Sequence, residues 1–284
     1  MEKISVDEMK LVELEIMDEI DRVCRDQGIT YFLGYGSCLG AVRHGGFIPW
    51  DDDMDVVMMR EDYERFLAVF NEVTGAEHMR AVSYRDKSAP CVFAKVVDVT
   101  TKVEERYSEA RYGSGVWVDV FPLDAVPAEN ADKVFKGCAK YGALRYLTVT
   151  DTATGSSGFI KLAKKIVCPV LKRKGPYGYA RKVDEIARDT AVPRDEALVA
   201  DFVAEADAGK ILKRSWFNPI EWEFEGHTFF IPEHYDEYLT ALYGDWKTPP
   251  PADDREMRAT RIGCRSVGAV LSPTRSEDGG PAWL

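Results

Sequence analysis

Apolar residues near the start of the chain recur at the spacing of an α-helix. Five of them would line one face: Met9, Val12, Ile16, Ile20 and Val23. Gly28 follows this run as a helix stop signal. The pattern therefore predicts an amphipathic N-terminal helix that packs on a sheet.

Runs typical of β-strands come next, at 31–33, 54–59, 91–99 and 115–124, and a further extended piece begins at Lys102. Helical patterns are predicted over 62–73 and then near 131–149, 158–172 and 177–190, separated by Gly, Ser and Pro clusters. Two alternating runs around Glu225 and Gly226 predict a hairpin over 222–232, followed by a short helix over 235–242. The fold class expected from this order is α+β, a mixed sheet flanked by helices.

The chain has 284 residues, 45% of them hydrophobic, which is enough for a sizeable core. Its net charge of −11 argues against nucleic acid as the main partner, because phosphate neutralisation requires clustered Lys and Arg. The six cysteines are scattered without a CxxC pair, so neither a zinc site nor a redox motif is indicated. Reduced thiols, the absence of an evident signal peptide and the lack of a long apolar run lead us to expect a cytoplasmic protein.

The stretch 34–55 concentrates the candidate chemistry. Gly34 and Gly36 permit a tight turn after the strand at 31–33, and Ser37 is expected to cap a helix that runs through Arg43. Such a helix start leaves backbone N–H groups available to an anion. His44 is expected to be a helix-end residue.

Four aspartates stand at positions 51, 52, 53 and 55. Their carboxylates repel one another, and a cation would relieve that repulsion. Asp53 and Asp55 precede and enter the strand at 54–59, and residues two apart on a strand project to the same face. Paired carboxylates suit Mg²⁺, with Mn²⁺ as the alternative.

Simpler interpretations of these features exist. A Gly-Ser turn before a helix is often only a cap, and an isolated Asp-x-Asp is often a solvated turn. A Ca²⁺ loop is another possibility, but the glycine and the distal glutamate of an EF-hand are missing. The anion-binding helix start at 34–37 and the aspartates at 51–55 lie about one short helix apart in the sequence. Finding both features together favours a functional site.

The run from Gly34 to Phe66 resembles the LicD family, which belongs to the nucleotidyltransferase-fold superfamily. The segment 115–124 is similar to that family's Asp-Ile-Phe-Pro-Leu-Asp pattern, and 238–250 is similar to its C-terminal signature. The resemblance implies a nucleotidyltransferase-like catalytic core over 1–128. A helical extension with the C-terminal hairpin would follow over 129–250 and pack on the core, and 251–284 is expected to be a mobile tail.

The superfamily brings a third carboxylate to the site on a later strand, and the resemblance assigns that role to Asp119. A carboxylate in an apolar strand requires a charged or hydrogen-bonding partner, and a metal would supply one. Asp124 is expected to cap a turn. Lys95 interrupts another apolar strand and would face donor phosphates, or else be a paired or snorkelling lysine.

The expected chemistry is metal-assisted phosphoryl transfer. Asp53, Asp55 and Asp119 would be the catalytic and metal-binding residues, with Asp119 also accepting a proton. The substrate phosphates would be held by Gly36, Ser37, Arg43 and Lys95.

The resemblance implies a CDP-linked donor, whose phosphocholine or similar group is transferred to a hydroxyl of a cell-surface glycan or its lipid-linked precursor. A true nucleotidyltransferase with the same metal site, or a non-catalytic scaffold of glycan biosynthesis, are the alternatives. The segment 159–174 carries six positive charges and no acid. It would lie on the inner face of the membrane or form a core-packed helix with a solvated face.

Overall fold

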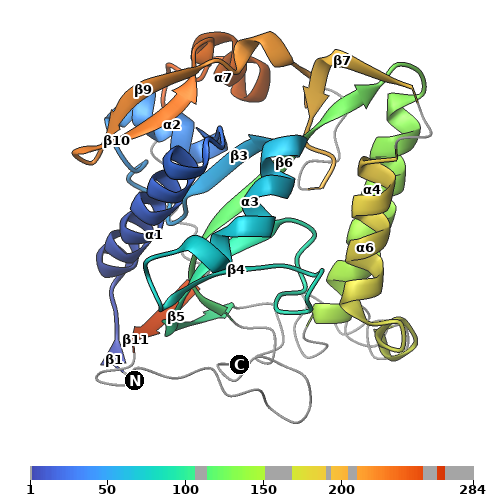
Figure 1. The fold of residues 1–284 in the computed structure, drawn as a ribbon, viewed down its shortest axis with the longest axis horizontal. Helices are drawn as coiled ribbons and strands as arrows, with labels where there is room; N and C mark the ends of the chain where they lie inside the picture. Colours follow the sequence, from blue (N-terminus) through green and yellow to red (C-terminus); the bar gives the residue numbers. More distant parts are fainter. Residues whose placement is uncertain are drawn as a thin grey trace.

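A mixed β-sheet runs through the middle of the protein, and its strands come from both ends of the chain (Figure 1). The computed structural model describes residues 2–105, 114–150, 168–189, 193–203, 210–251 and 261–265. The strands of this sheet are β1 (Glu2–Lys3), β2 (Phe32–Leu33), β3 (Asp55–Met59), β4 (Met79–Val82), β5 (Ala94–Glu105), β6 (Ser114–Pro127), β7 (Arg194–Ala200), β8 (Leu212–Lys213) and β11 (Arg261–Arg265). The expected α+β class is confirmed.

The main path of the sheet is β1-β11-β5-β6-β3-β2, with β4 on β5 and with β7 and β8 extending from β6. β3 and β6 run parallel, whereas β5 pairs antiparallel with β6. β4 and β7 were not predicted from the sequence. β7 is rich in charged residues and carries little strand signal of its own; it is held by pairing with the end of β6.

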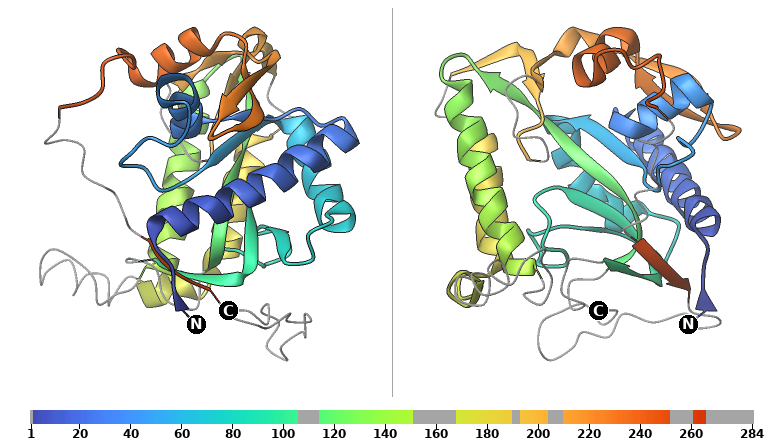
Figure 2. Two further views of the ribbon diagram at one scale, coloured as in Figure 1. Left: turned by 90° about the vertical axis from the view of Figure 1, so that its left-hand side faces the viewer. Right: turned by 180° about the vertical axis from the view of Figure 1, so that it is seen from behind.

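The helices cover the sheet in separate groups (Figures 1 and 2). They are α1 (Val6–Gln27), α2 (Tyr35–His44), α3 (Arg60–Val73), α4 (Ala131–Val149), α6 (Gly175–Ala187) and α7 (Tyr235–Tyr243), with a 3₁₀ turn at Arg214–Trp216. α1 begins with a capping box from Ser5 and Glu8 and ends at Gly28 in the left-handed conformation, at the predicted stop. α4 and α6 pack side by side at the far edge of the sheet.

The predicted hairpin is formed by β9 (Pro219–Phe224) and β10 (His227–Pro232). Its two turn residues, Glu225 and Gly226, have φ angles of 52° and 81°. Positive φ at both positions is what a type I′ hairpin turn requires.

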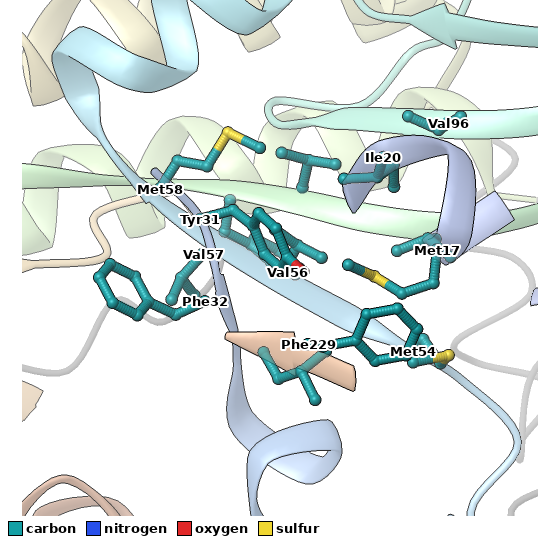
Figure 3. Packing of buried hydrophobic residues seen from close by; sticks show 14 of the residues in the cluster. Met17, Ile20, Tyr31, Phe32, Met54, Val56, Val57, Met58, Val96 and Phe229 are labelled. Atoms are coloured by element: carbon teal, nitrogen blue, oxygen red, sulfur yellow. The ribbon is translucent and has the colours of Figure 1, made fainter. Parts of the chain in front are cut away.

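The main hydrophobic core lies between α1, the sheet and the C-terminal hairpin. Met17 and Ile20 of α1 pack over Val56 and Met58 of β3, and Phe229 of β10 closes the cluster (Figure 3). A second cluster joins α4 and α6 to the end of β6. It includes Phe135, Val183, Phe202 and Val126, and the rings of Phe135 and Phe202 meet at a tilt of 43°. The hairpin and α7 therefore belong to the main core, although they lie far from it in sequence.

Two predicted segments fall partly outside the described residues. Of the basic segment 159–174, the structure describes 168–174, which is helical over 168–172. Of the expected tail 251–284, it describes residue 251 and Arg261–Arg265, which pair with β5 and β1.

Candidate functional site

The turn between β2 and α2 brings the start of α2 against β3. α2 begins after Gly34, and no side chain caps it. Ser37 therefore does not cap the helix, and that prediction was wrong. Ser37 lies inside the first turn, is buried, and its Oγ accepts a hydrogen bond of 2.8 Å from the backbone N–H of Asp55. The hydroxyl faces β3, so it fixes the first residue of that strand to α2.

Tyr35, the first residue of α2, has a φ of 43°, a region that a non-glycine residue adopts at a cost. Its N–H donates to the Tyr238 hydroxyl at 3.1 Å, and its own hydroxyl donates to Asp201 Oδ2 at 2.5 Å. Burial raises the pKa of Tyr35 well above its usual value, so the phenol stays a donor. These two contacts hold the turn in its strained conformation.

Three charged residues form one row across the central strands. Asp55 of β3 is in register with Asp119 of β6, and Asp119 is in register with Lys95 of β5. Neighbours in register are about 5 Å apart and share a face of the sheet. Lys95 Nζ lies 3.2 Å from Asp119 Oδ1, and both residues are more than nine-tenths buried. The register thus brings together residues predicted from three separate segments.

The loop before β3 carries the remaining acids. Ligand oxygens of Asp51, Asp52 and Asp53 lie within 4.8 Å of one another. Burial raises the pKa of Asp51 to about 7, and the negative charge of Asp53 adds to the effect. A Cβ on Gly36 would lie 2.7 Å from Asp51 Oδ2, so only glycine leaves room for this carboxylate at the start of α2. The sequence analysis assigned no role to Asp51, although the run of aspartates at 51–55 already indicated that its carboxylate would lie close to the others.

The clustered aspartates suit a hard divalent cation, because every candidate ligand atom is a carboxylate oxygen. The close packing of three carboxylates in the loop is unfavourable without a cation. Asp119 Oδ1 is buried and accepts no hydrogen bond from the described residues. The cation beside it there is the Lys95 ammonium. Asp51, Asp52 and Asp53 therefore fit Mg²⁺ or Mn²⁺ as they lie, and they are the one group of three such ligands within 4.8 Å among the described residues; Asp55 and Asp119 are related by the register of β3 and β6.

Arg43 lies at the opposite end of α2 from Gly36. Seven residues of helix separate their positions by roughly 10 Å along the axis. The Arg43 Nη1 donates to the Trp246 carbonyl at 2.7 Å, which ties the end of α2 to the segment after α7. The structure thus does not bring Arg43 beside Gly36 and Ser37. His44 is the last residue of α2, as expected.

The turn of the β9–β10 hairpin forms hydrogen bonds with the loop at 45–47, which precedes the aspartates. The Glu225 N–H donates to the Gly45 carbonyl at 2.9 Å, and the Glu225 carboxylate accepts from the Phe47 N–H at 3.0 Å. A Cβ on Gly46 would lie 2.0 Å from that carboxylate. The C-terminal hairpin therefore positions the loop before β3.

Asp124 does not cap a turn, so that prediction was also wrong. It is buried and receives two hydrogen bonds from Arg60, each of 2.7 Å. Arg60 also reaches Asp184 of α6 at 2.9 Å. Asp124 therefore joins the sheet to the helical extension. The signal missed in the sequence was its pairing with Arg60, which lies far from it along the chain.

Comparison with known proteins places these features in a family. The model described as LicD/FKTN/FKRP, nucleotidyltransferase domain, matches residues 28–138. Residues 28–138 form a LicD-family nucleotidyltransferase domain. This LicD domain contains the Gly36–Ser37 turn, the aspartate loop and the row of Lys95, Asp119 and Asp55.

Similarity extends beyond the LicD domain. The chain is 29% identical over 273 residues to the lipopolysaccharide cholinephosphotransferase LicD of Haemophilus influenzae, covering 90% of this chain and 96% of that protein. It is 54% identical over 35 residues to the ribitol 5-phosphate transferase FKRP of Homo sapiens, which is 12% of this chain and 7% of that protein. The mouse FKRP matches to the same extent.

Proposed function

We propose that this protein is a metal-assisted phosphotransferase that moves a phospho-substituent, such as phosphocholine, from a CDP-linked donor to a hydroxyl of a glycan or a lipid-linked glycan. The observation that carries the proposal is the row formed by Asp55, Asp119 and Lys95 beside the start of α2. Similarity to a cholinephosphotransferase over most of the chain supports the reaction class.

Asp53, Asp55 and Asp119 would hold Mg²⁺ or Mn²⁺. When bound, the metal supplies Lewis-acid polarisation of the donor diphosphate and neutralises charge on it. The N–H groups at the start of α2, near Gly36, and the ammonium of Lys95 would orient the phosphate groups.

In the transfer step, the acceptor hydroxyl oxygen bonds to the phosphorus that carries the substituent. The bond from this phosphorus to the bridging oxygen breaks, and CMP leaves. The hydroxyl proton passes to a carboxylate, and we assign this role to Asp119, which is the most enclosed of the three proposed ligands. Enclosure excludes water from the proton's path and strengthens the local electrostatics.

We place the reaction in the cytoplasm, at the inner face of the membrane if the acceptor is lipid-linked. No helix in the described part of the chain is long and apolar enough to cross a bilayer. Contact with lipid through the basic segment 159–174 remains a prediction, since most of that segment lies outside the described residues.

CDP-choline that is labelled twice in its phosphocholine half identifies the group that is transferred. The protein is incubated with Mg²⁺, a panel of glycan acceptors and CDP-choline that carries ¹⁴C in choline and ³²P in the choline-side phosphate. We expect both labels on the acceptor and CMP in solution. Release of labelled choline phosphate would instead indicate a nucleotidyltransferase. No turnover with CDP-choline or CDP-ribitol would favour the scaffold and contradict the proposal.

Gly36→Ala tests the close approach of α2 to Asp51. The new methyl group would displace Asp51 Oδ2 from a site 2.7 Å away. Asp51 lies two residues before the proposed ligand Asp53, so its displacement would also shift that carboxylate, and a misplacement of about 1 Å in a positioned group reduces the transfer rate by up to about 100-fold. The folded protein should not lose stability, because alanine in a helix is favoured over glycine by about 1 kcal/mol.

Gly142→Ala is the matched control, since a Cβ there meets no atom within 4 Å. We expect it to keep the wild-type transfer rate and to raise the melting temperature. Wild-type rates in both variants would show that the approach of Asp51 to α2 is irrelevant to the reaction.

A further inference from the structure

The Lys95 ammonium is enclosed by two residues of one strand. Its Nζ lies 3.6 Å from the centroid of the Trp117 ring and 3.2 Å from Asp119 Oδ1. Trp117 and Asp119 are two apart on β6, so they share a face, and Lys95 faces them from β5. Lys95 is only 7% exposed. An ammonium buried to this extent requires both the carboxylate and the aromatic face to offset its lost hydration.

The same carboxylate is a proposed metal ligand, so two cations would compete for it. Asp119 has Lys95 on one side of the row and Asp55 on the other. A divalent cation held by Asp55 and Asp119 would lie within a few ångströms of the ammonium and repel it. The lysine side chain is flexible and can move along the aromatic face of Trp117 without leaving the row.

We propose that Lys95 is a displaceable counter-ion: it neutralises Asp119 before the metal binds, and it turns to the donor phosphate once the metal has taken its place. The inference rests on the proposed function and adds an order of binding to it. Metal must bind first, because until then the ammonium is committed to Asp119. The metal and the phosphorylated donor should consequently bind with positive coupling.

A purely structural ion pair makes different predictions. If Lys95 served only to neutralise Asp119, its removal would leave a buried carboxylate and would not alter the coupling between metal and donor. If it is a competitor of the metal, its removal should tighten metal binding. Either role allows tighter metal binding in the variant, because a positive charge beside the site is lost, but only the displaceable counter-ion predicts weaker donor binding once the metal is bound. The change in donor affinity at saturating metal therefore separates the two roles.

The first test compares Mn²⁺ affinity, measured from the free-ion EPR signal, in the wild type and in Lys95→Met. We expect about tenfold tighter Mn²⁺ binding in the variant, together with about tenfold weaker CDP binding at saturating Mg²⁺, measured by calorimetry. Lys95→Arg, which keeps the charge, should restore CDP binding, and Lys102→Met on the same strand should change neither affinity. Unchanged or weaker Mn²⁺ binding in Lys95→Met, or unchanged CDP binding at saturating Mg²⁺, would overturn the inference.

A second test uses the wild-type protein, so it does not depend on whether the variant folds. The Lys95 Cε signal in a ¹³C spectrum should be shifted upfield by the Trp117 ring, and Trp117→Leu identifies it. Addition of Mg²⁺ should move the signal downfield. If Mg²⁺ binds but the signal stays in place, this inference fails while the proposed function stands. If no Mg²⁺ binds at all, the metal-assisted function fails as well.

Discussion

Replacing Asp55 by asparagine is expected to abolish phospho-group transfer while leaving the fold intact. Asp55 begins β3, is in register with Asp119, and is only half-buried. Its backbone N–H keeps the bond to Ser37 in the variant, since that contact does not involve the side chain. Loss of one metal-binding carboxylate removes about 4 kcal/mol or more of transition-state stabilisation, which corresponds to a rate at least about 1,000-fold lower.

The measurement is the single-turnover transfer rate at increasing Mg²⁺, set beside a thermal melt. Without metal, Asp55→Asn should melt at or above the wild-type temperature, because one repelling charge has been removed. Asp26→Asn is the control: this side chain is 60% exposed on α1, and its loss should leave the rate unchanged. A near-native rate for Asp55→Asn at saturating Mg²⁺ would remove Asp55 from the reaction centre.

Arg60→Leu should be the most destabilising single change in the ionic network between the sheet and the helical extension. The guanidinium of Arg60 is bound to Asp124 of β6 and to Asp184 of α6, and it also contacts Glu64 at 3.1 Å. Asp124 and Asp184 are nearly inaccessible, so the variant would leave buried negative charge without its main partner. The expected loss in the free energy of unfolding is about 3–5 kcal/mol.

Urea unfolding of Arg60→Leu and Arg65→Leu compares a buried with an exposed arginine on the same helix. Arg65 is 53% exposed; it pairs with Asp62 and donates to the Gln27 and Gly28 carbonyls, so its loss should cost about 1–2 kcal/mol, less than the loss of Arg60. Equal losses for the two variants would show that the contacts of Arg60 with Asp124 and Asp184 contribute little. If urea unfolds the sheet while α4 and α6 stay folded, or the reverse, the two hydrophobic clusters unfold separately.

The sequence was sufficient where the signal is local. The spacing of apolar residues predicted α1, and Gly28 marks its end because a left-handed residue is needed there. The alternating runs with Glu225 and Gly226 between them predicted the hairpin, since few residue pairs accept positive φ at both positions. The resemblance to the LicD family pointed to Asp119 as the partner of Asp55.

The missed features depend on contacts between distant parts of the chain. Ser37 looked like a cap because Gly-Ser turns often cap helices, and only the position of β3 shows that its hydroxyl is used by Asp55. Asp124 follows a proline and looked like a turn residue, but its partner Arg60 lies on another element. Arg43 was expected near Gly36 and Ser37, yet the length of α2 places it toward the opposite end of that helix. Periodicity and local motifs carry no information about such pairings.

The central claim is that the row of Asp55 and Asp119 is the reaction centre, and a crystal soaked with Mn²⁺ and CDP tests it most directly. Anomalous scattering at the manganese edge locates the ion without reference to activity. We predict a peak between the carboxylates of Asp55 and Asp119, with Asp53 as a further ligand and the diphosphate of CDP alongside. A peak confined to Asp51 and Asp52, or a diphosphate bound away from the row, would contradict the assignment.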